Sequence, residues 1–189
     1  MMSDAMLKEI EKLIQEKEIP TYPRLSEADI ETFNKQYGVE LPAEYVMFLT
    51  TVGDGWKKVH NQHFSSVRMN RLNESFRKPE WLKKDFPFSE AWLWEDDDDE
   101  AVFPRKPDES DKEYEIRINA LQDATAYGHL TLIDLGGGLG WDLILNGPSK
   151  GQIWFICGEG MSPCKPKLTF FEFLKMWLNG KQEISDFVP

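Results

Sequence analysis

The amino-acid sequence predicts an α+β fold: a single domain with a mainly antiparallel sheet, flanked by N-terminal helices and a C-terminal helix. Three observations favour this class. Apolar residues recur at helical spacing in the first fifty residues and again near the end, and alternating apolar runs lie between them, from Leu130 to Ile156. The two clearest runs are joined by a short link, and such links connect antiparallel strands. A chain of 189 residues suits one domain over residues 1–189.

Three helices are expected at the N-terminal end. The second begins at Ser26, with an approximate capping box, and stops at Gly38. The third starts around Pro42 and ends before Gly53, because proline suits a first helical turn and glycine suits the position after the last. The first helix ends before Pro20, and its apolar stripe consists of Met6, Leu7, Ile10, Leu13 and Ile14.

The remaining helices are predicted in the second half of the chain. A C-terminal helix begins at a capping box formed by Thr169 and Glu172, and its apolar stripe is expected to pack in the core. Residues 57–128 are expected to form short strands or turns that cover the sheet, followed by a polar insertion. Within this insertion one further helix is expected to begin at Ser110.

Three strands are predicted around a glycine cluster, in the runs LTLID, GWDLILN and QIWFI. Glycines 136–138 suggest a phosphate-binding loop, but their spacing does not fit one. A dinucleotide fingerprint that starts at Gly136 needs a glycine where Trp141 stands, and a strand follows where a helix should begin. We therefore expect these glycines to provide positive φ angles or close backbone approach in a tight connection between strands.

The cysteines and histidines predict no metal or cofactor site. Cys157 and Cys164 match no common zinc pattern, and free thiols are favoured, with a disulfide left open. His60 and His63 could share one face of a helix, but neither they nor His129 belong to a ligand motif. All three histidines are interpreted as ordinary surface residues or as satisfied by local hydrogen bonds.

Hydropathy favours a cytoplasmic protein that does not enter the membrane. No apolar run approaches the ~20 residues that span a bilayer. The charged, amphipathic N-terminal segment also lacks the uninterrupted apolar region of a signal peptide.

Negative charge is concentrated in the insertion at about residues 95–115. This segment has eleven acidic residues against three basic ones, a net charge of −8 out of −11 for the whole chain. Nucleic acid is excluded as a partner because phosphate binding depends on Lys and Arg, whereas a basic protein surface fits well. The candidate partner-binding residues are Asp96, Asp97, Asp98, Asp99 and Glu100.

The acidic segment has two other interpretations. Runs of charge are also typical of solvated loops, and this alternative stays open. A calcium loop that starts at Asp96 would need glycine and glutamate at its sixth and twelfth positions. Those positions hold Ala101 and Pro107, so no metal site is predicted.

Two groups of motifs resemble the SUKH superfamily of Smi/Knr-like domains. The resemblance covers about residues 26–178, with the middle weakly matched, and one departure is Gly53-Asp54-Gly55 where the family usually has an Asn-Gly-Gly-like sequence. The matching motifs are Ile30-x-x-Phe33, Tyr37-Gly38-x-x-Leu41-Pro42-x-x-Tyr45-x-x-Phe48-Leu49, Leu132-Ile133-Asp134-x-Gly136-Gly137-Gly138 and Asn146-Gly147-Pro148-x-x-Gly151-x-Ile153-Trp154.

The resemblance implies a single α+β domain that binds proteins and is not known for catalysis. Many bacterial members resemble immunity proteins that neutralise toxins, often nucleases, and fungal members are linked to cell-wall assembly signalling. The family's toxin contacts vary, so the resemblance carries over no binding residue. The residues interpreted as scaffold positions are Gly136, Gly140, Gly147, Gly151 and Trp154.

The charge pattern and the resemblance together predict a cytoplasmic immunity protein. It would occlude the active surface of a cognate toxin that presents a basic surface, with a nuclease as the favoured toxin class. One alternative is a non-catalytic regulatory scaffold of cell-wall assembly or signalling. Another is an enzyme with Asp134 or Asp142 as a catalytic carboxylate, although no nucleophile, histidine partner or metal ligand set lies near them in sequence. The sequence does not fix the oligomeric state.

Overall fold

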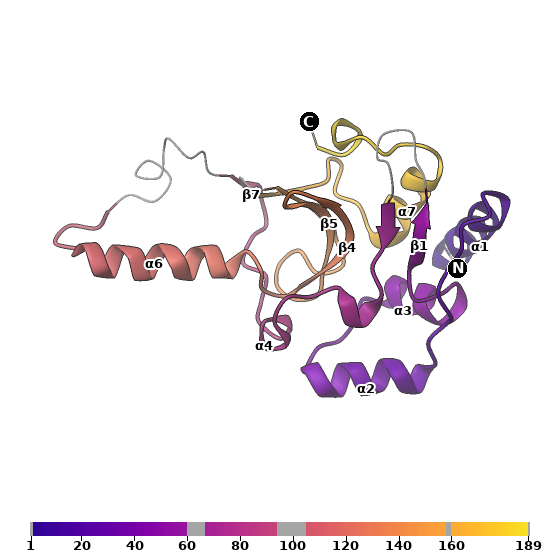
Figure 1. Cartoon of the computed structure of the whole chain (residues 1–189), viewed down its shortest axis with the longest axis horizontal. Helices are drawn as coiled ribbons and strands as arrows, with labels where there is room; N and C mark the ends of the chain where they lie inside the picture. Colours follow the sequence, from indigo (N-terminus) through magenta and orange to yellow (C-terminus); the bar gives the residue numbers. More distant parts are fainter. Residues whose placement is uncertain (1, 60–66, 94–104, 158–159, 189) are drawn as a thin grey trace.

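The computed structural model describes residues 2–59, 67–93, 105–157 and 160–188. It shows an α+β fold whose seven-stranded sheet is antiparallel throughout, in the order β1-β2-β4-β5-β6-β7-β3 (Figure 1). This confirms the predicted fold class. Over the described part of the chain, no helix is both long and apolar enough to cross a membrane.

The N-terminal helices form as their sequence signals predict. They are α1 (Met2–Glu16), α2 (Glu27–Tyr37) and α3 (Ala43–Thr51). Ser26 and Asp29 form a complete capping box, and Gly38 ends α2 in the left-handed conformation at φ 65°. Pro42 is the N-cap of α3, so this helix begins one residue after the proline.

The strands include the three predicted ones and four more. They are β1 (Trp56–Val59), β2 (Val67–Met69), β3 (Trp92–Leu93), β4 (His129–Gly136), β5 (Leu139–Ile144), β6 (Ile153–Cys157) and β7 (Gly160–Pro163). The expectation that short strands or turns in residues 57–128 cover the sheet holds for the segment around Phe86 but not for the short strands. Instead β1, β2 and β3 extend its two edges, because residues such as Trp56 and Met69 bury their side chains in the core of the domain.

One face of the sheet packs against helices to form the main core. Leu143 and Phe155 on this face lie in one apolar cluster with residues of all three N-terminal helices. The C-terminal helix α7 (Phe170–Leu178) begins at the predicted Thr169 capping box and buries its aromatic stripe in the same cluster. Trp141 contacts Phe173 of this helix, with ring centroids 5.4 Å apart. The prediction that this stripe packs in the core is therefore confirmed.

The opposite face of the sheet has a smaller apolar cover. Short helix α4 (Pro79–Leu82) leads into an extended segment that places Phe86 against Trp154, at a ring-centroid distance of 4.8 Å. Ile144 and Met161 complete this fully buried cluster. The cover protects only part of the second face, and a pocket lies beyond it.

Glycine geometry explains the β4–β5 and β5–β6 connections. Glycines 136–138 have φ values of 85°, 62° and 81°, which confirms the predicted positive φ angles in the β4–β5 connection. Gly147 also has a positive φ of 83°, and a Cβ atom there would clash with the backbone carbonyl of Phe86. Gly147 therefore lets the β5–β6 connection approach the segment that covers the second face.

The turn after α3 is held by a buried aspartate. Asp54, where the sequence departs from the family pattern, is 1% exposed. Its carboxylate accepts hydrogen bonds from the Leu72 backbone at 2.7 Å and from Arg71 Nε at 3.1 Å. The turn is thereby fixed to the short 3-10 helix η1 (Leu72–Glu74), which follows β2.

Candidate functional site

The five candidate partner-binding acids lie outside the described residues, and the structure therefore does not test them. They are Asp96, Asp97, Asp98, Asp99 and Glu100. The described part of the acidic segment begins at Arg105 and continues into helix α6 (Asp111–Ala124). This helix confirms the one predicted to begin at Ser110.

Residues 105–126, here called the α6 arm, project from the sheet (Figure 1). None of the residues in α6 is buried. The two large apolar side chains that are exposed in the described chain both belong to it: Ile116 is 59% exposed and Leu121 is 38% exposed. The arm therefore presents apolar surface as well as charge.

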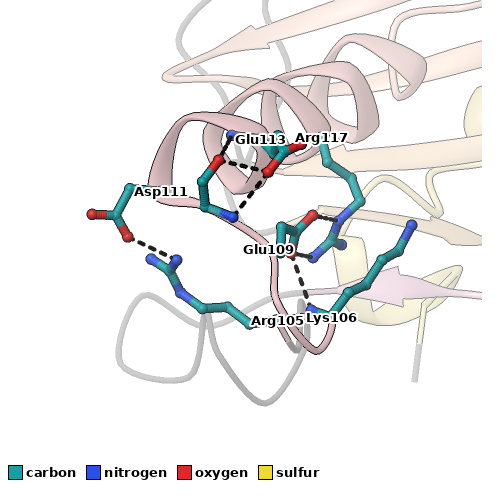
Figure 2. Close-up of polar contacts among 7 residues, drawn as sticks. Arg105, Lys106, Glu109, Asp111, Glu113 and Arg117 are labelled. Carbon is teal, nitrogen blue, oxygen red and sulfur yellow. Dashed lines mark hydrogen bonds and ion pairs between the residues drawn. The ribbon is translucent and has the colours of Figure 1, made fainter.

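A bidentate ion pair (Figure 2) stabilises the N-terminal end of the arm, which is the end far from the sheet in Figure 1. Arg117 donates from Nε and Nη2 to the two carboxylate oxygens of Glu109, each at 2.8 Å. Glu109 also accepts the backbone N–H of Lys106 at 3.1 Å. Because the hydrogen bonds from Arg117 favour the charged form, the pKa of Glu109 falls to about 2.

A capping box and a stacked arginine also stabilise this end of the arm. Ser110 and Glu113 cap the first turn of α6 reciprocally (Figure 2). Arg105 Nη1 lies 2.8 Å from the Asp111 carboxylate, and its guanidinium lies 4.3 Å from the Tyr114 ring centroid. Tyr114 is thus held by a cation–π contact, and the short loop before α6 has a defined shape.

A pocket of about 350 Å³ lies on the second face of the sheet, here called the sheet pocket. Its walls come from residues 74–77, from Thr125 and Ala126 at the end of the α6 arm, and from the glycine turn at residues 136–140. Buried Asn70 and Asp142 line it, as does His129. From the sequence, the arm and the glycine turn have separate functions. In the fold, the end of the arm next to the sheet and the glycine turn both line one concave site.

His129 and Asp142 form a buried pair in the sheet pocket. The Asp142 carboxylate contacts His129 Nδ1, and their side chains are 0% and 10% exposed respectively. His129 Nε2 lies 3.0 Å from the backbone carbonyl of Thr125, the C-cap of α6. A carbonyl can only accept, so Nε2 carries the proton of that bond. The pair therefore ties the end of the arm to the sheet.

Two acceptor oxygens in the sheet pocket are left without partners. Asp142 Oδ1 and Asn70 Oδ1 are buried and have no hydrogen-bond partner among the described residues. The other end of the Asn70 amide is used, because Nδ2 donates to the Thr131 carbonyl at 2.9 Å. A buried polar atom without a partner costs about 1–3 kcal/mol, and more when it is charged. These two oxygens are therefore an energetic cost within the fold.

The structure brings together residues that sequence reasoning kept apart. Asp134 and Asp142 both line the sheet pocket, and Asp142 has the histidine partner that was not visible in sequence. The pairing of Thr131 with Asp142 across β4 and β5 places His129 near the carboxylate. The hairpin alone could have suggested this proximity, but irregular register at Thr131 and Ile133 obscures it. Asp134 is exposed, and its Oδ1 accepts the Gly136 N–H at 2.8 Å.

The described residues show neither a group of metal ligands nor a disulfide. No group of three or more His, Cys, Asp and Glu side chains in them could hold a metal ion. Cys157 and Cys164 are free thiols, as favoured from their context. Of the three histidines, His129 contacts Asp142 and the Thr125 carbonyl, whereas His60 and His63 lie outside the described residues.

No protein-family model matches the chain, and no curated protein matches it either. Function is therefore inferred from the α6 arm and the sheet pocket, together with the sequence pattern.

Proposed function

We propose that this protein is a cytoplasmic immunity protein of the SUKH type, which binds a cognate toxin and occludes its active surface. A nuclease is the favoured toxin class, because a nuclease presents a basic surface to its own substrate. The motifs shared with the SUKH superfamily support the protein-binding class. The α6 arm supports the position of the interface.

The exposure of the α6 arm is the observation that carries the proposal. A lone helix of 14 residues is marginal in water, yet α6 lies away from the sheet with no buried residue. It also exposes Ile116 and Leu121, which a partner would remove from water. Residues 105–115 of the arm belong to the segment of net charge −8, and the arm has six acidic residues against four basic ones. Charge complementarity therefore favours a partner protein with a basic surface.

Neutralisation in this proposal requires no chemistry by the protein. The acidic segment accelerates encounter with the basic toxin, and the arm then covers the surface on which the toxin binds its substrate. His129 does not offer a free base, because Nε2 is bonded to the Thr125 carbonyl and Nδ1 faces Asp142. This arrangement supports a binding function over acid–base catalysis by the pair.

Co-expression with the product of the gene directly upstream tests the proposal. If that gene encodes a toxin, this protein should restore growth and should form a complex with the purified toxin. Growth arrest that persists despite full expression of both proteins would overturn the immunity function. Recovery only of a cell-wall or signalling enzyme in a pull-down would instead favour the scaffold alternative.

The position of the interface is tested by neutralising the five acids at residues 96–100, as amides. Association with the toxin should become slower and less sensitive to salt. A matched control removes the same total charge from exposed sites elsewhere, by Glu→Gln changes at Glu16, Glu27, Glu31, Glu40 and Glu80. If both variants associate at the same rate and with the same salt dependence, the acidic segment is not the interface.

Ile116 provides a test within the described arm. Ile116→Ser should leave the fold intact, because the side chain is 59% exposed, and should weaken the complex with the toxin by about tenfold. Circular dichroism establishes the fold and calorimetry the affinity. Unchanged affinity would remove the arm from the interface.

A further inference from the structure

The α6 arm exposes an apolar stripe along one side of its helix. Ile116 is 59% exposed, Leu121 is 38% exposed, and Ala120 between them is also exposed. At about 3.6 residues per turn, these side chains and Ala124 occupy less than half of the helix circumference. None of the residues in α6 is buried, so the other described elements leave the apolar stripe open to solvent. Such a stripe is typical of a helix that packs against another helix.

Opposite charges lie at the two ends of the arm. Residues 105–115, at the end far from the sheet, have five acidic residues against three basic ones, a net charge of −2. Residues 77–85, which contact the chain just after the arm, have four basic residues against two acidic ones, a net charge of +2. Charge therefore changes along α6 from a negative distal end to a positive end beside the sheet.

A row of aromatic and basic side chains fixes the position of this positive end. Lys84 Nζ lies 3.9 Å from the ring centroid of Tyr127, which follows α6 by three residues. The Tyr127 ring contacts the Trp81 ring at a centroid distance of 5.6 Å, and Lys78 Nζ lies 3.9 Å from the Trp81 centroid. The Gly128 N–H also donates to the Trp81 carbonyl at 3.0 Å. These four side chains, here called the basic row, are therefore held beside the arm.

Two copies of α6 that pack antiparallel bring their apolar stripes together. Ile116 and Leu121 are equally far along the helix from the point midway between residues 118 and 119. A two-fold axis at that point therefore sets Ile116 of one copy opposite Leu121 of the other. Ala120 and Ala124 are small, so the two helices can approach closely. Each copy then covers the apolar stripe of the other.

The same axis pairs opposite charges. Asp111 is as far from the axis as Ala126, which lies next to the basic row, so its carboxylate approaches Lys84 of the other copy. Lys112 approaches Asp123 of the other copy in the same way. A parallel arrangement would instead set Asp111 beside Asp111 and Lys84 beside Lys84. Like charges repel, and charge therefore selects the antiparallel arrangement.

We propose that the α6 arm is a self-association surface, on which a second copy of this chain packs its own arm in the antiparallel direction. The contact between two arms is at the small end of protein interfaces, so we expect a reversible dimer with a dissociation constant of about 1–100 µM. The second copy covers residues that the toxin is proposed to contact, so the two compete for the arm. Only this competition rests on the proposed function.

Sedimentation velocity of the full chain from about 1 to 200 µM tests self-association. The mass should rise from 22.0 kDa towards twice that value. Ile116→Arg should raise the dissociation constant of the dimer at least about tenfold, because it places a charge at the centre of the interface. Gln15→Arg adds the same charge at an exposed position of α1 and should dimerise as the natural protein does.

Circular dichroism of these two variants establishes that the helices are intact. If the natural protein stays a monomer at about 200 µM, the proposal is wrong. Equal dimerisation of Ile116→Arg and Gln15→Arg would also overturn it.

A charge exchange tests the antiparallel arrangement. Lys84→Glu and Asp111→Lys should each raise the dissociation constant about fivefold, because each sets like charges together at both ends of the interface. The double variant should return to within about twofold of the natural protein, since opposite charges then meet again. An equal mixture of the two single variants should form a mixed dimer for the same reason. A double variant that dimerises as weakly as the single variants would overturn the antiparallel arrangement.

Competition for the arm is tested by adding the toxin to the dimer. The product should contain one copy of each protein, because the toxin displaces the second copy. A complex that retains two copies of this protein would overturn the competition while self-association stands. If the dimer forms but no toxin is neutralised, the immunity function fails and self-association again stands.

Discussion

Asp142 and His129 lie on neighbouring antiparallel strands, and the aspartate contacts the histidine that holds the last carbonyl of α6. One buried pair thus connects the body of the protein to its projecting arm. The pair therefore anchors the arm to the sheet and also lines the sheet pocket.

His129→Phe should destabilise the protein by about 3 kcal/mol, because it leaves the Asp142 carboxylate buried without its partner. Urea denaturation measures this loss in the free energy of unfolding. The double variant His129→Phe with Asp142→Leu should recover much of it, since both polar partners are then removed. A single variant within about 0.5 kcal/mol of the natural protein would show that the pair is not structurally coupled.

The distal end of the α6 arm should lose stability progressively as the pH falls below about 4.5. The pKa of Glu109 is lowered from 4.5 to about 2 by hydrogen bonds from Arg117. A lowered pKa stabilises the folded arm above the unfolded value, and this stabilisation is lost as the pH falls from about 4.5 through about 2. The carboxyl carbon shift of Glu109, followed by NMR during acid titration, measures the value directly.

Arg117→Met provides the control for that titration. Without the guanidinium, the pKa of Glu109 should return toward 4.5 and α6 should fray at a higher pH. Titration of Glu109 near 4.5 in the natural protein would contradict the bidentate pair.

Alanine substitutions at two glycines should differ strongly in cost. Gly147→Ala should destabilise by more than about 2 kcal/mol, because φ is positive and the new Cβ atom clashes with the Phe86 backbone. Gly137 also has a positive φ, of 62°, but open space around it, so Gly137→Ala should cost about 1 kcal/mol. Thermal unfolding of the pair compares them, and equal costs would refute the packing argument at Gly147.

The two thiols should react at very different rates. Burial raises the pKa of the Cys164 thiol to about 12, so it has almost no thiolate at neutral pH and little access to reagent. Cys157 is only half-buried and should be labelled first by a thiol reagent in the native state. Mass spectrometry after brief labelling at pH 8 identifies the site. Faster labelling of Cys164 would contradict the burial.

Local signals made the helices and the central strands predictable. The capping boxes at Ser26, Ser110 and Thr169 all form, because each depends on residues three apart in the chain. The alternation of GWDLILN and QIWFI likewise identified β5 and β6. The short strands β1 to β3 were misplaced because two to four residues carry too little periodicity to show which edge of a sheet they join.

The candidate site was less predictable because its parts come from distant positions in the chain. Asn70, Thr125 and Asp142 meet only after β2 and β4 have paired and the α6 arm has returned to the sheet. The sequence indicated the acidic segment, and Asp142 could be identified from it as a candidate carboxylate. It did not show that Asp142 is the partner of His129.

By itself the sequence determined the fold class, the helix boundaries, the glycine turn and the concentration of negative charge, since these depend on local periodicity and composition. Only the tertiary structure decided which polar atoms are buried and which of them lack partners. Burial is a property of how strands and helices pack, so the unpartnered oxygen of Asp142 and the exposed apolar side chain of Ile116 became visible only in the folded protein.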